Sequence, residues 1–377
     1  MKGKRQRERR IVGKKVSMDY SLLFIIIFLL CFGLVMLYST SSYNALIKFK
    51  DPAYYLKTQI LATILGLIVM FAAAKLDYHM YVKMAALVYI ASLVCLVLVK
   101  TPLGIEANGA RRWIAVGPVS FQPAELAKIG IIMILAINIT NMRKRLDNFV
   151  VIIKLFLLAI PPVALILLLT KNMSSAIIVA GIAAVMLFVA SPKYKPFVII
   201  GVTAAALLAL VLFFGSDFRM ERIQAWQNPE AYSSGTAFQT IQSLYAIGSG
   251  GLVGKGLGQS VQKLGYVPEA QNDMIFSIIC EELGLFGGIA IILLFAFMIW
   301  RFMIIANNAR DLIGSMLVVG VLAHIAIQVV LNIAVVTNTI PNTGITLPFI
   351  SYGGTSILFL MAEMGMVLSV SKYERTE

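Results

Sequence analysis

The sequence predicts an all-α polytopic membrane protein with ten transmembrane helices and a large extracytoplasmic loop between the seventh and eighth helices. Hydrophobic residues make up 59% of the 377 residues and charged residues only 13%, which is more apolar surface than a soluble core can bury. A helix that spans a bilayer needs about 20 mostly apolar residues. Such runs lie at 20–39, 58–75, 81–99, 123–141, 150–170, 174–191, 197–214, 274–300, 312–336 and 347–370.

The first helix follows a basic tail, residues 1–17, and the even number of helices places both termini on one side. Lysines and arginines gather in this tail and in alternate loops, at 143–145, 193–195 and 301–310. By the positive-inside rule these loops, the tail and the last residues, 374–377, are cytoplasmic. The apolar run after the tail is long and no small-residue cleavage site follows, so we expect it to stay as a helix rather than to act as a signal peptide.

The net charge of +14 is therefore mainly a topology signal, together with affinity for anionic lipid headgroups. We expect no nucleic-acid partner, because no soluble basic domain exists to bind one. The three cysteines, Cys31, Cys95 and Cys280, fall within predicted helices and imply no disulfide framework.

The loop before the fourth helix carries Arg111 and Arg112 on the outer side, against the positive-inside trend. The guanidinium fork suits phosphate, so we predict that both arginines bind a phosphate group; interfacial anchoring is the alternative. Glu125 and Lys128 follow three residues apart on one face of the fourth helix. An ion pair there would neutralise two charges that a membrane tolerates badly singly.

The segment 215–273 is the largest extracytoplasmic loop, and a long loop on a compact bundle usually lines a site. Within it, residues 246–258 place six glycines around Lys255. Such a stretch lets backbone approach a phosphate and supplies N–H donors; a glycine-rich re-entrant turn with a solvated lysine is the alternative. It is not a Walker A loop, because Gly256 follows Lys255 where serine or threonine is required.

Asp273 stands at the boundary between this loop and the eighth helix, which carries Glu281 and Glu282 in its first turns. A carboxylate inside a bilayer costs on the order of 3 kcal/mol, so acids there are either paired or used in chemistry. At the edge of the hydrocarbon, Asp273 avoids most of that cost. From there it can reach both a lipid-anchored substrate and its soluble headgroup.

The ninth helix carries His324, Gln328 and Asn332 at four-residue spacing, a polar stripe that must face other helices or water. We interpret His324 as a hydrogen-bonded packing residue, with a catalytic role as the alternative. The segment 338–356 enters the tenth helix with two prolines and three glycines. Irregular backbone at membrane depth survives only where it is buried in protein or lines a cavity.

Six motifs together closely resemble the SEDS family of bacterial cell-wall polymerases, which contains the FtsW, RodA and SpoVE proteins. The motifs are Asn108-Gly-Ala-Arg-Arg-Trp, Gln122-Pro-Ala-Glu-Leu-Ala-Lys, the glycine-rich stretch 248–258, Pro268-Glu269 followed by Asp273, Glu281-Glu-Leu-Gly, and Leu347-Pro-Phe-Ile-Ser-Tyr-Gly-Gly-Thr-Ser. They occur in the family's order from the first helix to the tenth. The turn Pro341-Asn-Thr-Gly and the basic tail favour the division or sporulation type.

The resemblance implies a peptidoglycan glycosyltransferase that polymerises lipid II into glycan strands at the outer face of the bacterial cytoplasmic membrane. It also implies a class B penicillin-binding transpeptidase as partner, with other divisome or elongasome membrane proteins. The family's essential acid, in a Pro-Glu-x-x-x-Asp pattern, falls on Asp273, which we therefore predict to be catalytic. The family's arginine pair and its Glu-x-x-Lys fall on Arg111, Arg112, Glu125 and Lys128.

The remaining predicted site residues divide into two groups. Those expected to bind substrate are Arg111, Arg112, Lys255, Arg219 and Glu269, and those expected to support the site are Glu125, Lys128, Glu281, Glu282, Ser351 and Tyr352. One departure follows the fifth helix. Many members read Gln-Pro-Asp-x-Gly-Thr there, whereas this chain reads Lys171-Asn-Met-Ser-Ser, so any role of that aspartate is not expected here.

Extension of a glycan needs one base and cations for phosphate, because a sugar hydroxyl attacks an anomeric carbon whose leaving group is a lipid diphosphate. Asp273 would be the base. No Asp-x-Asp pair occurs and no cofactor is evident, but one aspartate with a diphosphate can hold a divalent cation, Mg²⁺ or Mn²⁺. Two alternatives stay open: a flippase that moves the lipid-linked precursor without forming bonds, and a scaffold that only recruits the transpeptidase.

Overall fold

The computed structural model describes residues 14–15, 18–107, 110–117, 119–195, 197–199, 201, 224–232, 235 and 237–374. The helices are α1 (Tyr20–Phe49), α2 (Tyr54–Lys75), α3 (Tyr78–Leu98), α4 (Pro123–Asn141), α5 (Phe149–Phe156), α6 (Ile160–Leu169), α7 (Met173–Ala190), α10 (Phe238–Gly250), α11 (Ile275–Asn308), α12 (Leu312–Val336) and α13 (Ser356–Val370). The strands are β1 (Lys14–Lys15), β2 (Gly104–Ala107), β3 (Ala110–Val116), β4 (Val119–Phe121) and β5 (Tyr373–Glu374). Short 3₁₀ helices are η1 (Arg143–Arg145), η2 (Leu157–Ala159) and η3 (Pro229–Tyr232).

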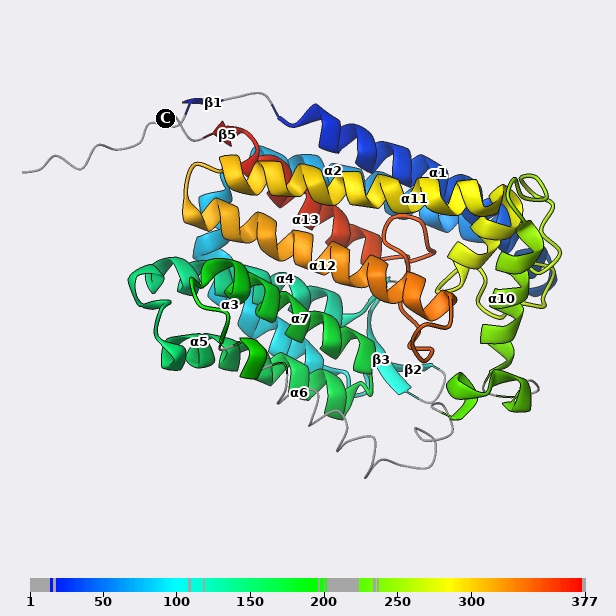
Figure 1. Cartoon of the computed structure of the whole chain (residues 1–377), viewed down its shortest axis with the longest axis horizontal. Coiled ribbons are helices and arrows are strands. Elements are labelled where there is room, and N and C mark those ends of the chain that lie inside the picture. Colours follow the sequence, from blue (N-terminus) through cyan, green and yellow to red (C-terminus); the bar gives the residue numbers. More distant parts are fainter. Residues whose placement is uncertain are drawn as a thin grey trace, which may run out of the picture.

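The chain is a multi-pass membrane protein. Within the described part of the chain, eight helical segments are long and apolar enough to cross a membrane, and α13 adds a shorter apolar helix. Figure 1 shows these long helices side by side, with α10 standing across one end of the bundle. The helix predicted at 197–214 falls almost wholly outside the described residues, so the number ten stays a prediction.

Four predicted helices are wrong in their bounds. The first, predicted at 20–39, continues to Phe49, and the fifth, predicted at 150–170, is divided into α5, η2 and α6. The eighth, predicted at 274–300, continues to Asn308 and is broken at Gly284, whose backbone is non-helical (φ 69°, ψ −170°). The tenth, predicted at 347–370, begins only at Ser356. Its first residues are not helical, because Phe349 has a left-handed backbone with φ 65°.

Two loops contain structure that apolar runs do not predict. The segment 215–273 was expected to be non-helical, but it contains α10, whose 13 residues mix apolar side chains with Gln, Thr and Ser. The loop 100–122 forms a three-stranded antiparallel sheet in the order β2-β3-β4. Short amphipathic elements of this kind fall below the length and hydrophobicity that mark a membrane span.

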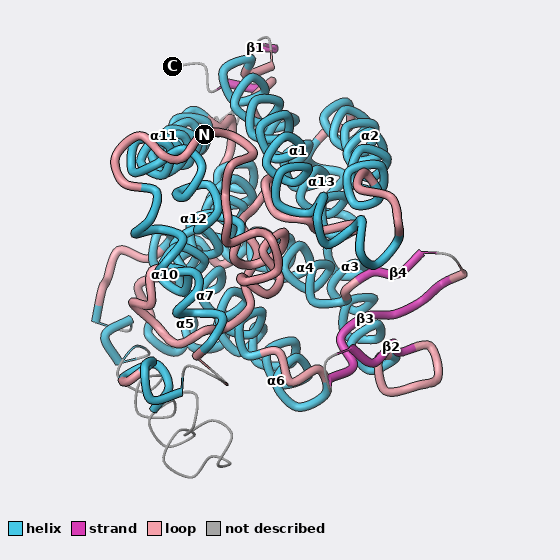
Figure 2. Tube along the Cα trace, turned by 90° about the vertical axis from the view of Figure 1, so that its right-hand side faces the viewer, coloured by secondary structure: helices cyan, strands magenta, loops and turns pink. Residues whose placement is uncertain are grey.

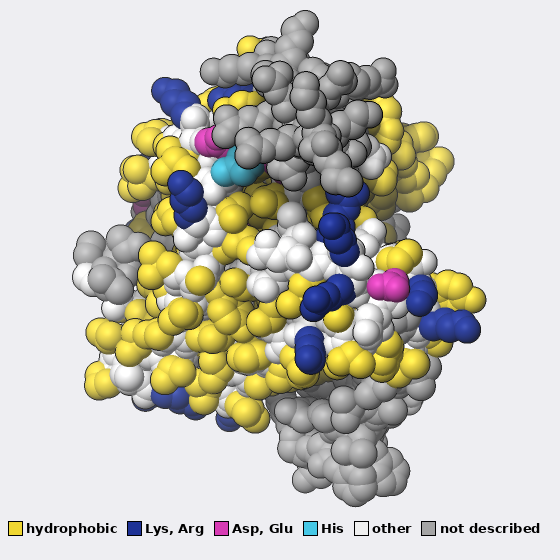
Figure 3. Space-filling view, turned by 90° about the vertical axis from the view of Figure 1, so that its left-hand side faces the viewer, with side chains coloured by type: hydrophobic (Ala, Val, Ile, Leu, Met, Phe, Trp, Pro, Cys, Tyr) yellow, Lys and Arg dark blue, Asp and Glu magenta, His cyan; other side chains and the backbone are white. Residues whose placement is uncertain are grey.

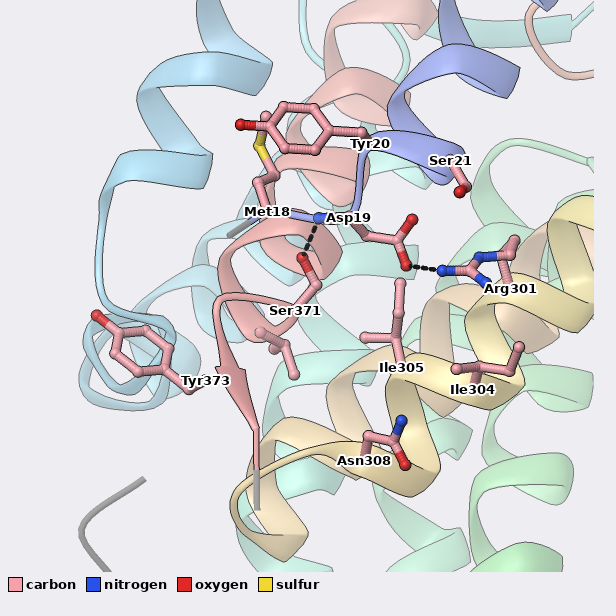
Figure 4. A pocket seen from close by; sticks show the side chains of 11 residues that line it. Met18, Asp19, Tyr20, Ser21, Arg301, Ile304, Ile305, Asn308, Ser371 and Tyr373 are labelled. Atoms are coloured by element: carbon pink, nitrogen blue, oxygen red, sulfur yellow. Dashed lines mark hydrogen bonds and ion pairs between the residues drawn. The ribbon is translucent and has the colours of Figure 1, made fainter. Parts of the chain in front are cut away.

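The first and last described residues of the chain lie at one end of the bundle, which we call the terminal end. There β1 pairs with β5 in antiparallel register. Asp19 caps α1 by accepting a hydrogen bond from the N–H of Leu22 at 2.9 Å, and it also forms an ion pair with Arg301 of α11. Figure 4 shows this pair beside a cavity of about 300 Å³, next to Ser371 from the end of the chain.

Basic residues gather at the terminal end. Lys and Arg side chains are prominent on this face of the molecule in Figure 3. Residues 143–145 and 193–195, which the sequence places in cytoplasmic loops, are all exposed. The two loops are also neighbours, because the hydroxyl of Ser191 donates to the carbonyl of Leu146 at 3.3 Å. Loops rich in lysine and arginine are the ones that the positive-inside rule places in the cytoplasm.

The opposite end, which we call the site end, holds α10, the sheet β2-β3-β4 and the start of α11. Figure 2 views the molecule from this side, with loops and short elements lying over the helix ends. Among the long helices, α12 contacts α11, α7, α4 and α13, so it lies inside the bundle. Polar residues on α12 therefore face protein rather than lipid.

Candidate functional site

Asp273 lies at the site end, in the turn that leads into α11 and outside the membrane-spanning helix itself. Its Oδ1 accepts a hydrogen bond from Nε2 of Gln239, on α10, at 3.2 Å. Its Oδ2 faces Gly344, where an added Cβ atom would lie 3.7 Å away. One carboxylate oxygen is thus held, and the other is directed at a glycine in the loop between α12 and α13.

The environment of Asp273 suits a base that works near neutral pH. The pKa of this carboxyl group is raised from the ordinary value of 3.8 to about 7, mainly because the group is buried and also because of the negative charge of Glu269. The hydrogen bond from Gln239 acts in the opposite direction. A group whose pKa lies near the working pH is the efficient proton acceptor in general base catalysis.

Gln239 connects Asp273 to two other segments. Besides Asp273, its Nε2 donates to the carbonyl of Pro268 at 3.2 Å, and its Oε1 accepts from Nδ2 of Asn342 at 3.0 Å. Asn342 in turn accepts from the N–H of Gly344 at 3.1 Å. These amide side chains, which sequence reasoning missed, therefore tie the loop before α11 to the loop after α12.

The polar stripe of α12 holds the backbone of the same region. Nδ2 of Asn332 donates to the carbonyl oxygens of Asp273 at 2.8 Å and Ile345 at 2.6 Å. One turn away, Nε2 of Gln328 donates to the carbonyl of Thr346 at 3.1 Å. The stripe thus satisfies irregular backbone that could not otherwise lie at membrane depth.

His324, at the inner end of the stripe, is buried and bonded through both ring nitrogens. Nδ1 lies 2.7 Å from Oε2 of Glu363, and Nε2 lies 2.9 Å from Oε1 of Gln328. These contacts fit the interpretation of His324 as a packing residue.

Glu125 and Lys128 form the ion pair that the sequence predicts. Nζ of Lys128 lies 2.8 Å from Oε1 of Glu125 and 3.3 Å from Oε1 of Gln328. The Lys128 side chain is only 2% exposed, so its charge needs these partners. The pair adjoins a cavity of about 30 Å³ that Glu125, His324, Gln328 and Ser351 help to line.

The structure separates Arg111 and Arg112, which the sequence treats as a pair. Both lie on β3, where successive side chains point to opposite faces. Nε of Arg111 lies 3.4 Å from Oε2 of Glu106, on β2, and its side chain is 42% exposed. Arg112 instead donates to the carbonyl oxygens of Thr170 and Lys171, which follow α6. A cation at this helix end also suits the helix dipole.

The glycine-rich stretch lies against the break in α11. The carbonyls of Gly251 and Leu252 accept from the N–H groups of Leu285 at 2.9 Å and Phe286 at 3.2 Å. In return, the N–H of Lys255 donates to the carbonyl of Glu281, and the N–H of Gly256 donates to that of Glu282, both at 3.0 Å. The stretch thus pairs the backbone groups that the break frees, and these N–H donors are engaged by α11.

Close packing explains why this joint contains glycines. A Cβ atom on Gly284 would lie 2.4 Å from the backbone nitrogen of Gly254, and one on Gly254 would lie 2.2 Å from the carbonyl oxygen of Glu282. Both glycines also have positive φ angles, 69° and 85°. The two backbones therefore approach more closely than any residue with a side chain would allow.

Glu281 and Glu282 are both fully buried and paired. Oε1 of Glu281 lies 2.7 Å from Nζ of Lys255, and Oε1 of Glu282 lies 2.8 Å from Nζ of Lys263. Lys255, which the sequence assigns to substrate, is thus engaged with Glu281, although its side chain remains 33% exposed. Lys263 was missed, because a lysine in a polar loop gives no sign of burial.

The other predicted residues lie around these contacts, except for Arg219, which is outside the described residues. Glu269 is exposed, has a left-handed backbone with φ 54°, and accepts from Nδ2 of Asn272. Oγ of Ser351 accepts from the N–H of Leu347 at 2.8 Å, which closes the turn before α13. The N–H of Tyr352 donates to the carbonyl of Gln271 at 2.9 Å.

Comparison with known proteins identifies the family. The sequence model of the FtsW/RodA/SpoVE family, described as cell cycle proteins, matches residues 20–376. The chain belongs to the FtsW/RodA/SpoVE family. The match covers all the helices described above, and it includes the loop that carries Asp273.

Two curated relatives and one solved chain illustrate the similarity. Stage V sporulation protein E of Bacillus subtilis is 42% identical over 96% of this chain and 99% of its own length. The probable peptidoglycan glycosyltransferase FtsW of a Geobacter species is 37% identical over 96% of this chain and 98% of its own. A chain solved in a study of how a peptidoglycan synthase complex coordinates polymerization and crosslinking is 28% identical, with a TM-score of 0.78, over 94% of this chain and 97% of that one.

The departure from the FtsW/RodA/SpoVE pattern at residues 171–175 lies next to the site. The side chain of Asn172 caps α7 by accepting from the N–H of Ser175 at 3.1 Å. The hydroxyl of Ser174 donates to the carbonyl of Thr343, the residue before Gly344. In this chain the segment thus supports the loop that faces Asp273.

Proposed function

We propose that this chain is a peptidoglycan glycosyltransferase that polymerises lipid II, the undecaprenyl-diphosphate-linked precursor, into glycan strands during division or related septal wall synthesis. The observation that carries the proposal is Asp273, a partly buried carboxylate with a pKa of about 7 in the turn before membrane helix α11. Relatives along nearly the whole chain that are named as probable peptidoglycan glycosyltransferases support it.

In this reaction a hydroxyl of one sugar attacks the anomeric carbon of another. Oδ2 of Asp273 takes the hydroxyl proton while the new carbon–oxygen bond forms. The bond between the anomeric carbon and the diphosphate breaks, and the electron pair leaves with the diphosphate. Gln239 holds Oδ1 and so directs Oδ2 toward the substrate. General base catalysis of this kind contributes roughly 10² to 10⁴ in rate.

Cationic side chains would offset the charge of the leaving diphosphate. Arg111 is the best placed among the described candidates, because its guanidinium is partly exposed and its bond to Glu106 is long, at 3.4 Å. Arg112 and Lys255 would act on the diphosphate through their positive charges rather than by direct contact. A backbone carbonyl engages Arg112, and Glu281 engages Lys255. Arg219 is a further proposed ligand, and Glu269 would accept from sugar hydroxyls.

A divalent cation, Mg²⁺ or Mn²⁺, is part of the proposal. Among the described residues, no three His, Cys, Asp or Glu side chains are grouped as metal ligands. Asp273, with Glu269 nearby, would therefore hold such an ion together with diphosphate oxygens, a mode that Mg²⁺ commonly uses. When bound, the ion would neutralise phosphate charge.

The proposal places the protein in the bacterial cytoplasmic membrane with both termini in the cytoplasm. The basic terminal end supports this orientation, which puts Asp273 at the outer face where lipid II is used. The similarity to a chain from a synthase complex that coordinates polymerization and crosslinking supports a crosslinking partner. We propose that this partner is a class B penicillin-binding transpeptidase, joined by other divisome or elongasome membrane proteins.

The test is the substitution Asp273→Asn in protein reconstituted with its transpeptidase and given labelled lipid II. Asparagine keeps the shape and the contact with Gln239 but cannot take a proton, so we expect polymer formation to fall by roughly 10² to 10⁴. Asp51→Asn is the matched control, because Asp51 is an aspartate between α1 and α2 that pairs with Lys57 at 2.7 Å. It should polymerise normally.

Full polymer yield from Asp273→Asn would contradict the assignment of the base. Lipid II movement across liposomes is measured in the same preparations. Robust transport by the unmodified protein without any polymer would favour a flippase instead.

A further inference from the structure

We infer that Glu281 and Glu282 are positioning residues for the reaction: they fasten the loop 251–274 to the broken helix α11 and thereby fix the carboxylate of Asp273. The inference rests on the proposed role of Asp273 as the base. It goes further by giving two buried acids outside the site a part in the rate of the reaction.

The short segment of α11 before the break lies inside the protein. Residues 274–282 are all buried, whereas exposed apolar side chains begin directly after Gly284, at Leu285 and Phe286. Helix α11 thus consists of two parts: a buried helix before Gly284, which starts beside Asp273, and a lipid-facing helix after it. Glu281 and Glu282 lie at the end of the buried helix, where the loop folds over it.

Glu281 receives an unusual number of hydrogen bonds. Its carboxylate is fully buried, and the donors are Nζ of Lys255 at 2.7 Å, the N–H groups of Val261 at 3.1 Å and Gln262 at 3.3 Å, and the hydroxyls of Ser249 and Ser260. Three of these donors come from the consecutive residues 260–262. The carboxylate therefore holds one turn of the loop, in the way that an acid caps a helix.

Glu282 ties the same turn to a different helix. Its Oε1 accepts from Nζ of Lys263 at 2.8 Å and from the hydroxyl of Ser39, on α1, at 2.7 Å. Nζ of Lys263 also lies 2.9 Å from the Ser39 hydroxyl, and the N–H of Ser260 is 3.4 Å from Glu282. Glu282, Lys263 and Ser39 are all buried, so this group is shielded from water.

A chain of contacts leads from this turn to Asp273. Gln262, whose N–H is on Glu281, accepts at its carbonyl from the N–H of Val267 at 2.9 Å. The next residue is Pro268, whose carbonyl accepts from Nε2 of Gln239, which also holds Oδ1 of Asp273. A shift of the turn 260–262 would therefore move the groups that orient the base.

The charges decide what loss of a partner does. A buried carboxylate is stable only when it is paired, and removal of one partner leaves an uncompensated charge in a dry environment. The loop would then have to move to admit water. Because a misplacement of about 1 Å can lower a rate about 100-fold, such movement would act on the turnover of bound substrate more than on its binding.

The experiment compares Glu281→Gln and Glu282→Gln with the control Glu363→Gln. Glu363 is equally buried and pairs with His324 at 2.7 Å, but it belongs to α13 and does not contact the loop. Turnover and KM are measured with labelled lipid II, per molecule of folded protein. For both loop-side variants we expect kcat to fall roughly 10- to 100-fold with KM nearly unchanged, and we expect the control to keep its kcat.

Rescue by a conservative substitution supplies a second readout. Lys263→Arg keeps a positive charge beside Glu282 and should restore most of the activity that Lys263→Met loses. Normal kcat in both glutamine variants would overturn the inference.

Two further variants cover the case in which the glutamine variants do not fold. Lys255→Met removes one of the five donors to Glu281 at a side chain that is 33% exposed, and Ser39→Ala removes one partner of Glu282. Both should lower kcat in the same direction but less, and normal kcat in both would equally contradict the inference. If Asp273→Asn is inactive while all these variants are normal, only the positioning role fails. If Asp273→Asn is active, the base assignment fails.

Discussion

The two acids of the Pro-Glu-x-x-x-Asp motif have opposite environments although four residues separate them. Glu269 is exposed and lies in a turn, whereas Asp273 is partly buried and held by Gln239. The negative charge of the exposed acid raises the pKa of the buried one. Under the proposed function, Glu269 would thus tune the pKa of the base.

Glycan polymerisation should therefore depend on pH in a way that Glu269 controls. Asp273 must be ionised to accept a proton, so the rate should rise with pH through a limb near 7. Glu269→Gln removes a nearby negative charge and thus lowers the pKa of Asp273, so the limb should move to lower pH. Initial rates between pH 5 and 9 measure this. A limb that stays in place in Glu269→Gln would show that burial alone sets the pKa.

The sequence predicts the charged residues of the site better than its amides. Asp273 and the Glu125–Lys128 pair stand out because a charge in or near a bilayer must have a use or a partner. Gln239 and Asn342 give no such signal, and Asn332 stands out only as part of the polar stripe on α12. They are neutral, and their partners are mostly carbonyls far away in the sequence, which only the fold brings together.

At the scale of elements, α11 shows where apolar patterning stops being informative. The run from 275 to 308 is apolar throughout, and a single glycine in such a run usually continues the helix. The break at Gly284 depends instead on the loop 251–256, which supplies partners for the freed backbone groups. Sequence periodicity describes a segment by itself and cannot predict a joint made by two segments.

The joint should be intolerant of any side chain at Gly284. Alanine there would place Cβ 2.4 Å from backbone atoms of Gly254 and Leu252, at a φ of 69°. A left-handed backbone alone costs on the order of 1 kcal/mol for alanine, and the clash adds to it. We expect Gly284→Ala to lower the temperature of unfolding in detergent by several degrees.

Gly248→Ala is the matched control for that experiment. Gly248 lies in α10, and an added Cβ atom there would meet no atom within 4 Å. This variant should be as stable as the unmodified protein or slightly more stable, because alanine favours helix. Equal stability of the two variants would contradict the account of the joint.

At the scale of the whole molecule, length and charge predict most of the architecture. Apolar runs locate the spans, and pairing of β1 with β5 agrees with both termini lying on one side. Length and charge do not predict the site end, where α10, the sheet and the turn before α13 are short and polar. Their structure comes from contacts between loops, and such contacts leave no periodic trace in the sequence.

The orientation of the bundle can be tested with single cysteines in a variant that lacks the three native ones. A cysteine at Gln227, an exposed residue of the large loop, should react with a membrane-impermeant maleimide in intact cells. A cysteine at Lys144, exposed in a loop predicted to be cytoplasmic, should react only after permeabilisation. The reverse pattern would place Asp273 in the cytoplasm and exclude the use of lipid II at the outer face.

The break in α11 also bears on how the chain enters the membrane during synthesis. The lipid-facing helix, from Leu285 to Asn308, is about 36 Å long at about 1.5 Å per residue, which is enough by itself to cross the hydrocarbon core. The translocon can therefore insert it without drawing Glu281 and Glu282 into lipid. The buried helix can then dock later, together with the loop that carries Lys255 and Lys263. These lysines would neutralise Glu281 and Glu282 in the same step.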